Sequence, residues 1–445
     1  MLAANTSVKG LQNDRGIMSK IEPTLYDLLV CGGGPAGFPA AIQAARQGLR
    51  VLLVEKSGIL GGTTTLNRVA FPGLFDAWGK QIIAGIGWDL VRKAALESGH
   101  VIPDFAEIPA RHWQHQIRLC STLFAAAIDE EALASGCDLL LHTVPSSVGG
   151  GGDEPWRVQL CGKEGLHTVS AKWLIDCTGD ANLAALAGCE LRTSPDGLQP
   201  GTLVFRMEGY ELGDLDLAEI DRHVPTAIDA GELHRSDLGW GECSIVQLLR
   251  SHGENSIHIP SVDASTSRGK TEAEVKGRQS ILRVYRFLKK QPGLDKLRIS
   301  WCAAECGIRE TRSIVGESTV RCEDYVSGRL WDDAVCYSYY PIDLHTDEGL
   351  DCRRLSPGVF PTLPLSAMTP KGVGGILVAG RCISGDRLAN SAFRVQASCM
   401  AMGQAAGAIS ACAVRQQVRA ASLVCRDAWR QAIREQGGIV PQASV

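Results

Sequence analysis

The chain has 445 residues, of which 45% are hydrophobic and 21% are charged. This composition is typical of a globular protein that is large enough for two domains with sizeable cores. A formal net charge of -4 at pH 7 and a pI near 6.2 argue against a nucleic-acid-binding surface. No run of about 20 apolar residues occurs, so we expect no membrane span.

Sixteen cysteines are scattered along the chain, many of them in apolar stretches, and none forms a C-x-x-C pair. Buried, reduced thiols in a cytoplasmic protein explain this pattern more simply than disulfides do. The missing C-x-x-C also argues against dithiol flavoenzymes and the usual iron–sulfur clusters, and we expect no metal site.

The chain is expected to begin with a disordered leader over residues 1–22, which carry basic side chains but no apolar targeting segment. Residues 28–30 then form an apolar strand, and the turn GGGPAG that follows has the G-x-G-x-x-G spacing. Gly32 allows a tight turn, Gly34 lets a pyrophosphate approach the backbone, and Gly37 lets helix and strand pack closely. The first N–H groups of the helix would bind phosphate oxygens.

An acidic residue ends the next strand at the spacing of a nucleotide site. The helix at 40–45 stops at Gly48, and an apolar strand at 51–54 leads to Glu55, 18 residues after Gly37. A carboxylate near this spacing binds the ribose hydroxyls of an adenosine. Strand, turn, helix, strand and acid in this order predict a Rossmann-type dinucleotide site. A unit of the same shape without a ligand would leave Glu55 unexplained.

A second glycine pair makes this interpretation specific. Lys56 follows the acid, and the sequence GGTT comes shortly after, at 61–64. Together with the glycine turn, these residues resemble the FAD-dependent oxidoreductases of the glutathione-reductase type. In that fold, similar segments hold the adenosine and lead towards the ribityl chain. Residues 72–81 resemble a bacterial subgroup of these proteins whose substrates are mostly unassigned.

The next elements are expected to complete the first part of this domain, which we place at residues 23–192. An amphipathic helix is predicted within 113–135, and a strand follows at 137–141. The resemblance implies that Val144 presents its backbone to adenine. The four glycines at 149–152 are expected at the tip of a hairpin, because no helix follows them.

A second marker of the family ends this part of the chain. Residues 172–180 read as a strand that ends in Thr178-Gly179-Asp180, with a short helix after it. They resemble the A-T-G-D segment of the family, which passes the FAD pyrophosphate on its far side. Cys177 stands in the place of the alanine, and both side chains are small.

Residues 193–369 carry no glycine fingerprint, and with the resemblance they are interpreted as an inserted α+β substrate domain. Short strand-like runs such as 201–207 accompany one long helix near 271–290. The apolar side chains of this helix, Val275 and Leu282 among them, are expected to form a buried face. The basic ones then form a solvated face, with a binding patch as the weaker alternative.

Two arginines within this segment are candidates for substrate binding. Arg309 and Arg312 lie three residues apart, so on a helix or turn they could share a face and bind a carboxylate or enolate. Pairing inside the protein with Glu305, Glu310 or Glu317 is an equally weighted alternative.

His345 ends the run YYPIDLH at 339–345. A histidine at the end of a strand that faces the flavin could take a hydroxyl or C–H proton while hydride passes to N5, because imidazole titrates near neutrality. A structural histidine is the alternative.

The last marker closes the expected site. Residues 374–386 read as strand, turn and acid, and a helix follows at 395–412. In the flavoproteins that this segment resembles, the acid matched by Asp386 binds a ribityl hydroxyl. The helix N-terminus after Arg394 points its dipole at the N1/O2 edge of the isoalloxazine. A plain helix cap is the alternative role of Asp386.

The resemblance thus implies an α/β fold: a Rossmann-type FAD-binding domain of glutathione-reductase type, interrupted by the inserted α+β domain. We expect the second part of the FAD-binding domain at 370–415 and a C-terminal helix or tail at 416–445. The substrate is expected to contact His345, Arg309 and Arg394. The expected FAD-binding residues are Gly32, Gly34, Pro35, Ala36, Gly37, Glu55, Lys56, Gly61, Gly62, Thr63, Thr64, Val144, Thr178, Gly179, Asp180, Gly380, Gly385, Asp386, Val395 and Gln396.

The function expected from this resemblance is hydride transfer between a small polar organic molecule and flavin N5, in a dehydrogenase, an oxidase or a C=C reductase. Only one dinucleotide fingerprint occurs, which favours an external electron acceptor, such as oxygen or a redox protein, over NAD(P)H. One alternative is an NAD(P)H-driven flavin monooxygenase. Another is a non-redox dinucleotide-binding protein similar to thiazole synthases, against which the acid at Asp386 argues. The sequence leaves the oligomeric state open.

Overall fold

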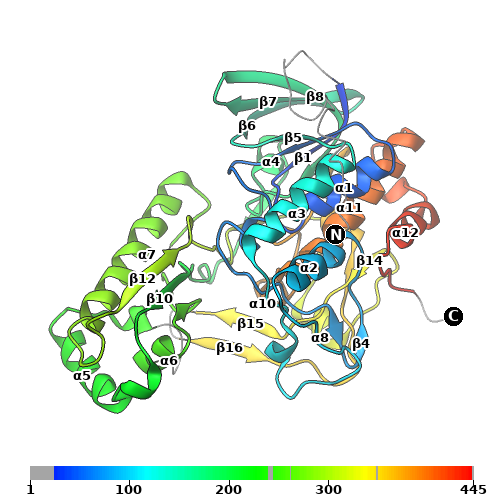
Figure 1. The fold of residues 1–445 in the computed structure, drawn as a ribbon. Helices are drawn as coiled ribbons and strands as arrows, with labels where there is room; N and C mark the ends of the chain where they lie inside the picture. Colours follow the sequence, from blue (N-terminus) through cyan, green and yellow to red (C-terminus); the bar gives the residue numbers. More distant parts are fainter. Residues whose placement is uncertain (1–24, 239–243, 261, 347–348, 443–445) are drawn as a thin grey trace, which may run out of the picture.

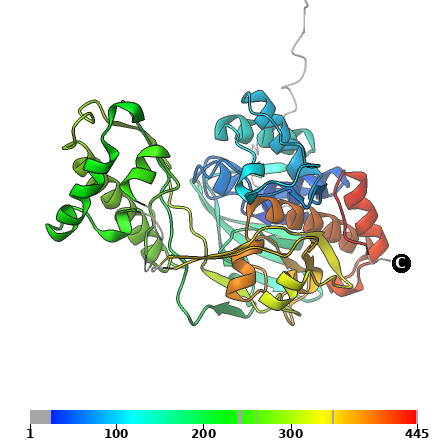
Figure 2. The ribbon, with the colours of Figure 1, turned by 90° about the horizontal axis from the view of Figure 1, so that it is seen from below.

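The computed structural model describes residues 25–238, 244–260, 262–346 and 349–442. The expected leader at 1–22 lies outside this part. Hydrophobic side chains form two separate cores: one extends along the chain from Tyr26 to Val440, and the other contains only residues from Leu203 to Cys306. We call the segment 203–306 the inserted lobe. Figures 1 and 2 show it, mostly in green, beside the main body.

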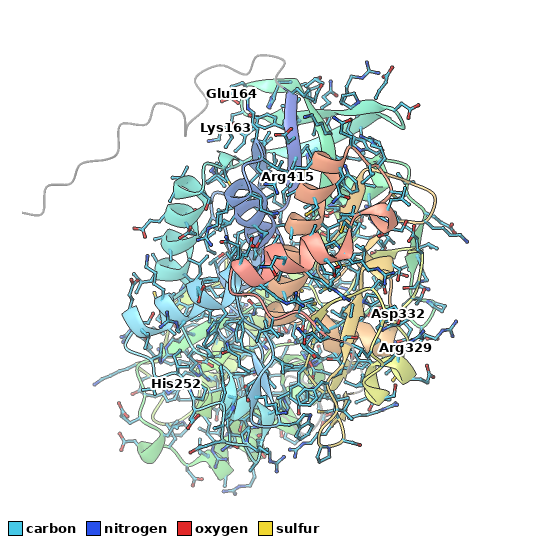
Figure 3. All side chains as sticks on the ribbon, turned by 90° about the vertical axis from the view of Figure 1, so that its right-hand side faces the viewer. Lys163, Glu164, His252, Arg329, Asp332 and Arg415 are labelled. Atoms are coloured by element: carbon cyan, nitrogen blue, oxygen red, sulfur yellow. The ribbon has the colours of Figure 1, made fainter. Side chains whose placement is uncertain are left out.

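A seven-stranded sheet lies at the centre of the main body, in the order β5-β2-β1-β8-β7-β6, with β18 also paired to β8. Its parallel strands are β1 (Leu25–Cys31), β2 (Val51–Val54), β5 (Asp138–Leu140), β8 (Gly165–Asp176) and β18 (Ile376–Val378). β6 (Val144–Gly151) and β7 (Glu154–Gly162) extend it as an antiparallel hairpin, with the glycines at 149–152 near its tip as predicted. Lys163 and Glu164 turn the chain from β7 into β8 (Figure 3).

The predicted Rossmann-type unit is confirmed. β1 leads through the glycine turn into α1 (Gly37–Arg46), and β2 follows in parallel register with Leu28 opposite Val51. The fold class is therefore α/β with a parallel sheet. Because every residue of β2 and residues 28–31 of β1 are buried, these stretches are continuous apolar runs in the sequence.

The helix predicted within 113–135 is shorter than expected. α3 covers Ser121–Ala134, and the chain before it forms a 3-10 turn, η2 (His112–His115), and an extended segment. Ile117 and Leu119 are buried while their neighbours are more exposed, which is the alternation of an extended chain. These side chains pack against the core without a helix.

Other helices cover the sheet of the main body: α2 (Ile86–Glu97), α4 (Asn182–Leu186), α11 (Gln396–Gln416) and α12 (Arg426–Glu435). α11 is long and apolar enough to cross a membrane, but 89% of its apolar window is buried inside the protein. It crosses α1 closely, since a Cβ at Gly403 would lie 1.9 Å from the Ala36 carbonyl oxygen. α11 is therefore a core helix, and this contact fixes its N-terminus beside the glycine turn.

The inserted lobe packs helices against a small antiparallel sheet. Its strands are β10 (Phe205–Glu208), β11 (Gly253–Glu254) and β12 (Arg298–Cys302), and its helices are α5 (Leu217–Asp229), α6 (Ile245–Arg250) and α7 (Ser267–Leu288). The expected buried face of α7 is partly wrong, because Val275 and Leu282 are each 43% exposed. The buried stripe is instead spaced at 273, 277, 281 and 284. Its first two residues, Ala273 and Gly277, are small, so the stripe is not evident from the large apolar residues alone.

The chain returns to the main body after the lobe. Short paired strands follow, namely β13 (Arg312–Ile314) with β9 (Leu191–Thr193), β14 (Ala334–Tyr337) with β17 (Thr362–Pro364), and β15 (Ile342–His345) with β16 (Leu350–Arg353). The helices here are α8 (Cys322–Ser327), α9 (Leu365–Met368) and α10 (Arg387–Phe393). Residues from Ile314 to Met368 join the first core, although the domain boundaries at 193 and 369 stay predictions. In Figure 1, β15 and β16 extend towards the lobe.

Candidate active site

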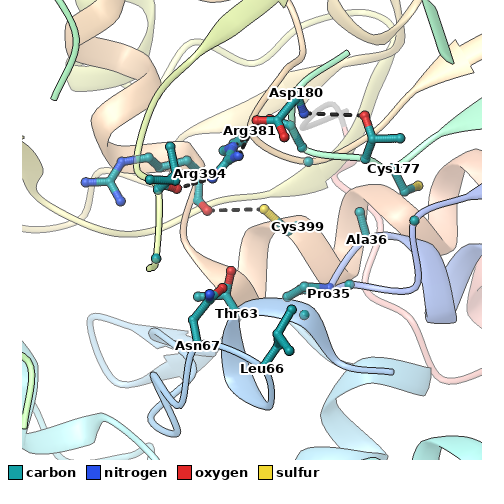
Figure 4. Close-up of a pocket in the computed structure, with 18 of the residues that line it drawn as sticks. Pro35, Ala36, Thr63, Leu66, Asn67, Cys177, Asp180, Arg381, Arg394 and Cys399 are labelled. Atoms are coloured by element: carbon teal, nitrogen blue, oxygen red, sulfur yellow. Dashed lines mark hydrogen bonds and ion pairs between the residues drawn. The ribbon is translucent and has the colours of Figure 1, made fainter. Parts of the chain in front are cut away.

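A cavity of about 820 Å³ lies at the carboxyl ends of the parallel strands. Its wall includes Cys31 at the end of β1, Cys177 after β8 and Ala379 after β18. Lys270 and Glu305 of the inserted lobe form part of another wall. Ligands of open α/β sheets bind in such crevices, so this cavity is the candidate active site (Figure 4).

The glycine turn has the geometry that a bound pyrophosphate needs. Gly32 has a φ of +98°, and a Cβ there would lie 2.3 Å from the Cys177 carbonyl oxygen. A Cβ at Gly37 would lie 1.6 Å from the Gly32 carbonyl oxygen, so both glycines are required by packing. Gly34 is different, because a Cβ there would meet only the Gly62 Cα, at 3.8 Å. Protein packing does not require Gly34 to lack a side chain, whereas close approach of a ligand does.

Glu55 is held in place at the end of β2 and lines the cavity. Its Oε2 accepts a hydrogen bond from the Gly33 N–H at 2.7 Å, and its Oε1 accepts from the N–H and Oγ of Ser57 at 2.9 and 2.8 Å. Each carboxylate oxygen can accept more than one hydrogen bond. The carboxylate therefore keeps the capacity to accept from a ribose hydroxyl, and the fit to an adenosine is good.

The N-terminus of α11 also faces the cavity, where Val395 and Gln396 are part of the wall. Val395 is the N-cap and offers no side-chain hydrogen bond to the helix, so the first N–H groups carry the positive end of the helix dipole unopposed. Gln396 forms hydrogen bonds with the Thr64 hydroxyl and with the Val69 carbonyl oxygen.

Most of the expected cofactor residues share this one cavity. Those in its wall are Gly32, Gly34, Pro35, Ala36, Glu55, Lys56, Gly62, Thr63, Val144, Thr178, Gly179, Asp180, Gly380, Val395 and Gln396. The expected residues that are not part of the wall are Gly37, Gly61, Thr64, Gly385 and Asp386. Gly37 and Thr64 support neighbours that do line it, through the packing and the hydrogen bond described above.

Asp386 lies outside the cavity wall and caps a helix. Its Oδ1 accepts from the Ala389 N–H at 2.8 Å and caps α10, and its Oδ2 accepts from the Cys322 N–H at 2.7 Å. These contacts fit the helix-cap alternative, and the ribityl role stays a prediction. The loop between β18 and α10 carries the chain away from the cavity before Asp386 is reached.

Arg381 enters the cavity instead, because it directly follows Gly380 at the end of the strand. Its Nε donates to the Gly179 carbonyl oxygen at 2.5 Å, and its Nη2 donates to Asp180 Oδ1 at 2.6 Å; Nη1 contacts the Ile308 carbonyl oxygen. Figure 4 shows this guanidinium beside Asp180. With a cation at this position, the argument from Asp386 against a non-FAD dinucleotide no longer holds.

His345 lies at the end of β15 and lines the same cavity, with 5% of its surface exposed. Its Nε2 is 3.3 Å from Asp343 Oδ2. The ring of His258, from the inserted lobe, contacts the His345 ring edge-on at a centroid distance of 5.0 Å. The expected strand-end histidine is thus present beside a carboxylate and a second histidine.

Arg309 and Arg394 also line the cavity near His345. Arg309 is buried, and its Nη1 donates to the Pro200 carbonyl oxygen at 2.7 Å and to Thr202 Oγ1 at 3.0 Å. Arg394 Nη2 is 3.3 Å from the Asp343 carbonyl oxygen and 3.6 Å from Asp343 Oδ2. The Nε of Arg394 is buried and has no hydrogen-bond partner among the described residues.

Arg309 and Arg312 both line the cavity, but the chain between them is not helical and they have different partners. Arg312 Nε donates to the Asp180 carbonyl oxygen and its Nη2 to Asn182 Oδ1, both at 2.8 Å. Neither Arg309 nor Arg312 forms an ion pair with Glu310 in the described part of the chain, because Glu310 pairs with Arg387. Arg309 therefore has Arg394, not Arg312, as its cationic neighbour.

Burial and charge set the protonation of this group. Burial and the nearby Arg309 lower the pKa of His345 to about 4. Burial alone would raise the pKa of Asp343, but the hydrogen bond with His345 and the charges of His345, Arg394 and Arg309 lower it to about 2. Burial, with Arg394 beside it, lowers the pKa of Arg309 to about 9. At neutral pH the imidazole is therefore neutral, Asp343 is anionic and Arg309 is cationic.

Sequence reasoning missed Asp343, Arg381, His258 and Gln199, which accepts from Arg394 Nη2 at 3.3 Å. Asp343 could have been found from the sequence, because it lies two residues before His345 on the same strand and such residues point to the same side. Arg381 had a sequence signal as well, because it directly follows Gly380, shortly after the end of β18. His258 and Gln199 come from distant parts of the chain and had none. In the described part of the chain, no cluster of three or more His, Cys, Asp or Glu could hold a metal ion.

Comparison with family models gives a match that covers most of the chain. The family model "FAD dependent oxidoreductase" matches residues 27–433. The chain is 60% identical over 38 residues to dihydrolipoyl dehydrogenase of Trypanosoma brucei brucei, covering 8% of each protein. It is 30% identical over 175 residues to thiamine thiazole synthase of Sulfolobus acidocaldarius, covering 36% of this chain and 58% of that protein. Each match thus covers less than two thirds of the relative.

Solved structures are similar only at a distance. A geranylgeranyl bacteriochlorophyll reductase-like protein from Thermoplasma acidophilum has a TM-score of 0.44 and 15% identity, covering 92% of this chain and 83% of that one. The OxyS anhydrotetracycline hydroxylase from Streptomyces rimosus has a TM-score of 0.41 and 14% identity, covering 93% and 70%. Neither likeness bears on the reaction. The family match, the parallel sheet and the lined cavity agree, and the chain belongs to the FAD dependent oxidoreductase family.

Proposed function

We propose that the protein transfers a hydride between FAD and a small, polar, negatively charged organic substrate. The observation that carries this proposal is the single cavity shared by the glycine turn, Arg309, Arg394 and His345. FAD, when bound, supplies the hydride acceptor or donor at flavin N5. Glu55 and the glycine turn would hold its adenosine and pyrophosphate.

His345 is proposed as the proton partner of the substrate. Burial and Arg309 lower its pKa to about 4, so the imidazole is neutral at pH 7 but is a weak base, and proton uptake depends on the neighbouring carboxylate. The Asp343 carboxylate, 3.3 Å from Nε2, orients the ring and stabilises the imidazolium that forms. This arrangement suits the oxidation of an alcohol or amine, with the proton passing to the ring.

Arg394 and Arg309 are proposed to bind the anionic group of the substrate. A buried N–H group without a hydrogen-bond acceptor is energetically costly, and Arg394 Nε is such a group among the described residues. An acceptor oxygen on the substrate would remove this cost. Guanidinium groups bind carboxylates through paired, charge-assisted hydrogen bonds. Since Asp343 neutralises only part of the charge of the two arginines, an added carboxylate would be favoured electrostatically.

The electron partner is proposed to be oxygen or a redox protein, because the chain carries one dinucleotide fingerprint and none in the inserted lobe. A dehydrogenase or oxidase is therefore favoured over an NAD(P)H-driven monooxygenase. A cytoplasmic location fits the cysteines, since all those in the described residues are free thiols.

Two observations favour a second candidate function. The match to thiamine thiazole synthase is 30% identical over 175 residues, and the cavity wall contains Arg381 but not Asp386. A dinucleotide-binding role without electron transfer would be compatible with both.

The test is an absorption spectrum of the purified protein before and after acid precipitation, followed by anaerobic addition of NADH, NADPH and a panel of small acids. We expect flavin bands that are released by acid and are bleached by one of the acids. Bleaching by NAD(P)H instead would favour a reductase or monooxygenase. Absence of flavin, with no reconstitution by added FAD, would favour the second candidate.

A further inference from the structure

The inserted lobe meets the main body across the cavity mainly through polar contacts. The two hydrophobic cores share no buried residue, although Val69 of the main body packs against the core of the lobe. Glu305, which belongs to the lobe, accepts hydrogen bonds from Lys56 Nζ with both of its carboxylate oxygens, at 2.7 and 2.9 Å. Its backbone carbonyl oxygen accepts from Asn67 Nδ2 at 2.9 Å.

Lys270, at the start of α7, completes this group of contacts. Its Nζ is 3.6 Å from Glu305 Oε2 and 2.8 Å from Glu274 Oε1, and it donates to the Cys306 carbonyl oxygen at 2.6 Å. Lys56, Asn67, Lys270 and Glu305 all line the cavity, and we call these four residues the clasp.

The clasp is placed beside the adenosine part of the cofactor site. Lys56 directly follows Glu55, and Asn67 follows the stretch at 61–64 that packs on the glycine turn, where Gly62 Cα is 3.8 Å from a Cβ built at Gly34. Of the four residues, Lys56 and Asn67 belong to the main body, whereas Lys270 and Glu305 belong to the lobe. A cofactor in the cavity therefore has the main body on one side and the lobe on another.

We propose that the inserted lobe is part of the FAD site and that the clasp closes over the adenosine end of FAD and sets the rate at which FAD leaves. This inference concerns cofactor retention, goes beyond the proposed reaction and does not depend on the substrate. It rests on FAD as the cofactor and on contacts that join the two walls of the cavity.

The contacts of the clasp are individually weak, as is expected of contacts that break and re-form. The side chains of Lys56 and Glu305 are 52% and 28% exposed, so their ion pair is screened by salt and contributes modestly. Arg68 adds a similar contact, with its guanidinium 4.6 Å from the Trp301 ring centroid. A shared apolar core would instead fasten the lobe permanently.

The experiment measures FAD release from the purified holoprotein after dilution, by the rise in fluorescence of free FAD. In Glu305→Gln, release is expected to be about threefold to tenfold faster than in wild type, the range of a small ionic network. Lys93→Gln is the matched control, because Lys93 forms a comparable ion pair with Glu130, 2.9 Å long, outside the cavity wall. Its release rate is expected to equal that of wild type.

A salt series and a charge swap complete the design. Raising NaCl from about 0.05 to 0.5 M is expected to accelerate release from wild type more than from Glu305→Gln. The double variant Lys56→Glu/Glu305→Lys is expected to release FAD more slowly than either single variant, which separates a lost ion pair from misfolding. Wild-type release rates in Glu305→Gln and Lys56→Glu, or equal salt dependence in all variants, would overturn the proposal.

Discussion

The charge of the cavity is decided by a few individual side chains. Arg381 follows Gly380, shortly after β18, and donates to Asp180 Oδ1 at 2.6 Å. Arg309 and Arg394 add two more guanidinium groups to the wall. The cavity is therefore richer in cations than the sequence resemblance implies, and this favours an anionic substrate over a neutral one.

Substitution of Arg394 tests whether this side chain binds the anionic group of the substrate. Arg394→Gln removes the cation and its unsatisfied N–H, so the KM of the anionic substrate should rise about 10- to 100-fold, the range for a hydrogen bond to a charged group. Steady-state kinetics measures this effect. Arg353→Gln is the control, because Arg353 is an exposed arginine paired with Asp351. Equal KM values in wild type and Arg394→Gln would contradict the assignment.

His258 makes a prediction about stability and pH. Burial, with Arg309 and His345 nearby, lowers its pKa to about 2, whereas an unfolded histidine has a pKa of about 6.5. Below about pH 6.5 the unfolded chain therefore binds a proton that the folded chain does not, and the free energy of unfolding falls as pH falls. In chemical denaturation between pH 7 and 5, His258→Gln should lose less stability than wild type. An identical pH dependence would argue that His258 is protonated in the fold.

At the scale of elements, local patterns were sufficient where a strand, turn or helix is defined by its own residues. The run 28–30, the glycine turn and the strand at 51–54 were predicted correctly because burial on both faces leaves a continuous apolar run. The predicted buried face of α7 was only partly correct and the predicted start of α3 was wrong, since packing against distant segments decided both. The position of Asp386 outside the cavity wall was not evident from the sequence, because the length of the loop before it cannot be read from a motif.

The close crossing of α11 and α1 predicts that a side chain at Gly403 destabilises the protein. A Cβ at Gly403 would lie 1.9 Å from the Ala36 carbonyl oxygen, so Gly403→Ala must push the helices apart. The cost should be about 1 to 3 kcal/mol or more, with weaker FAD retention because the N-terminus of α11 moves. Thermal unfolding and FAD content measure both effects. Gly149→Ala is the control, since nothing lies within 4 Å of its Cβ and wild-type values are expected there.

In the whole molecule, the site is assembled from segments far apart in the sequence. The glycine turn and Glu55 come from the first part of the chain, His258 from the inserted lobe, and Asp343 with Arg394 from the later part. A sequence motif could predict the nucleotide half of this cavity, because it is built by one continuous unit. The substrate half depends on how the lobe and the β15–β16 hairpin pack on that unit, which no single motif encodes.

The proposed exchange of a hydride between an anionic substrate and FAD, beside His345 and the two arginines, can be tested on the bound flavin. The experiment is anaerobic stopped-flow reduction of the flavin by matched pairs of compounds, each pair a small hydroxy or amino acid and its neutral amide. We expect bleaching by at least one acid, at least about tenfold faster than by its amide, with that preference lost in Arg394→Gln. Equal rates for acids and amides, or a preference that survives in Arg394→Gln, would contradict it.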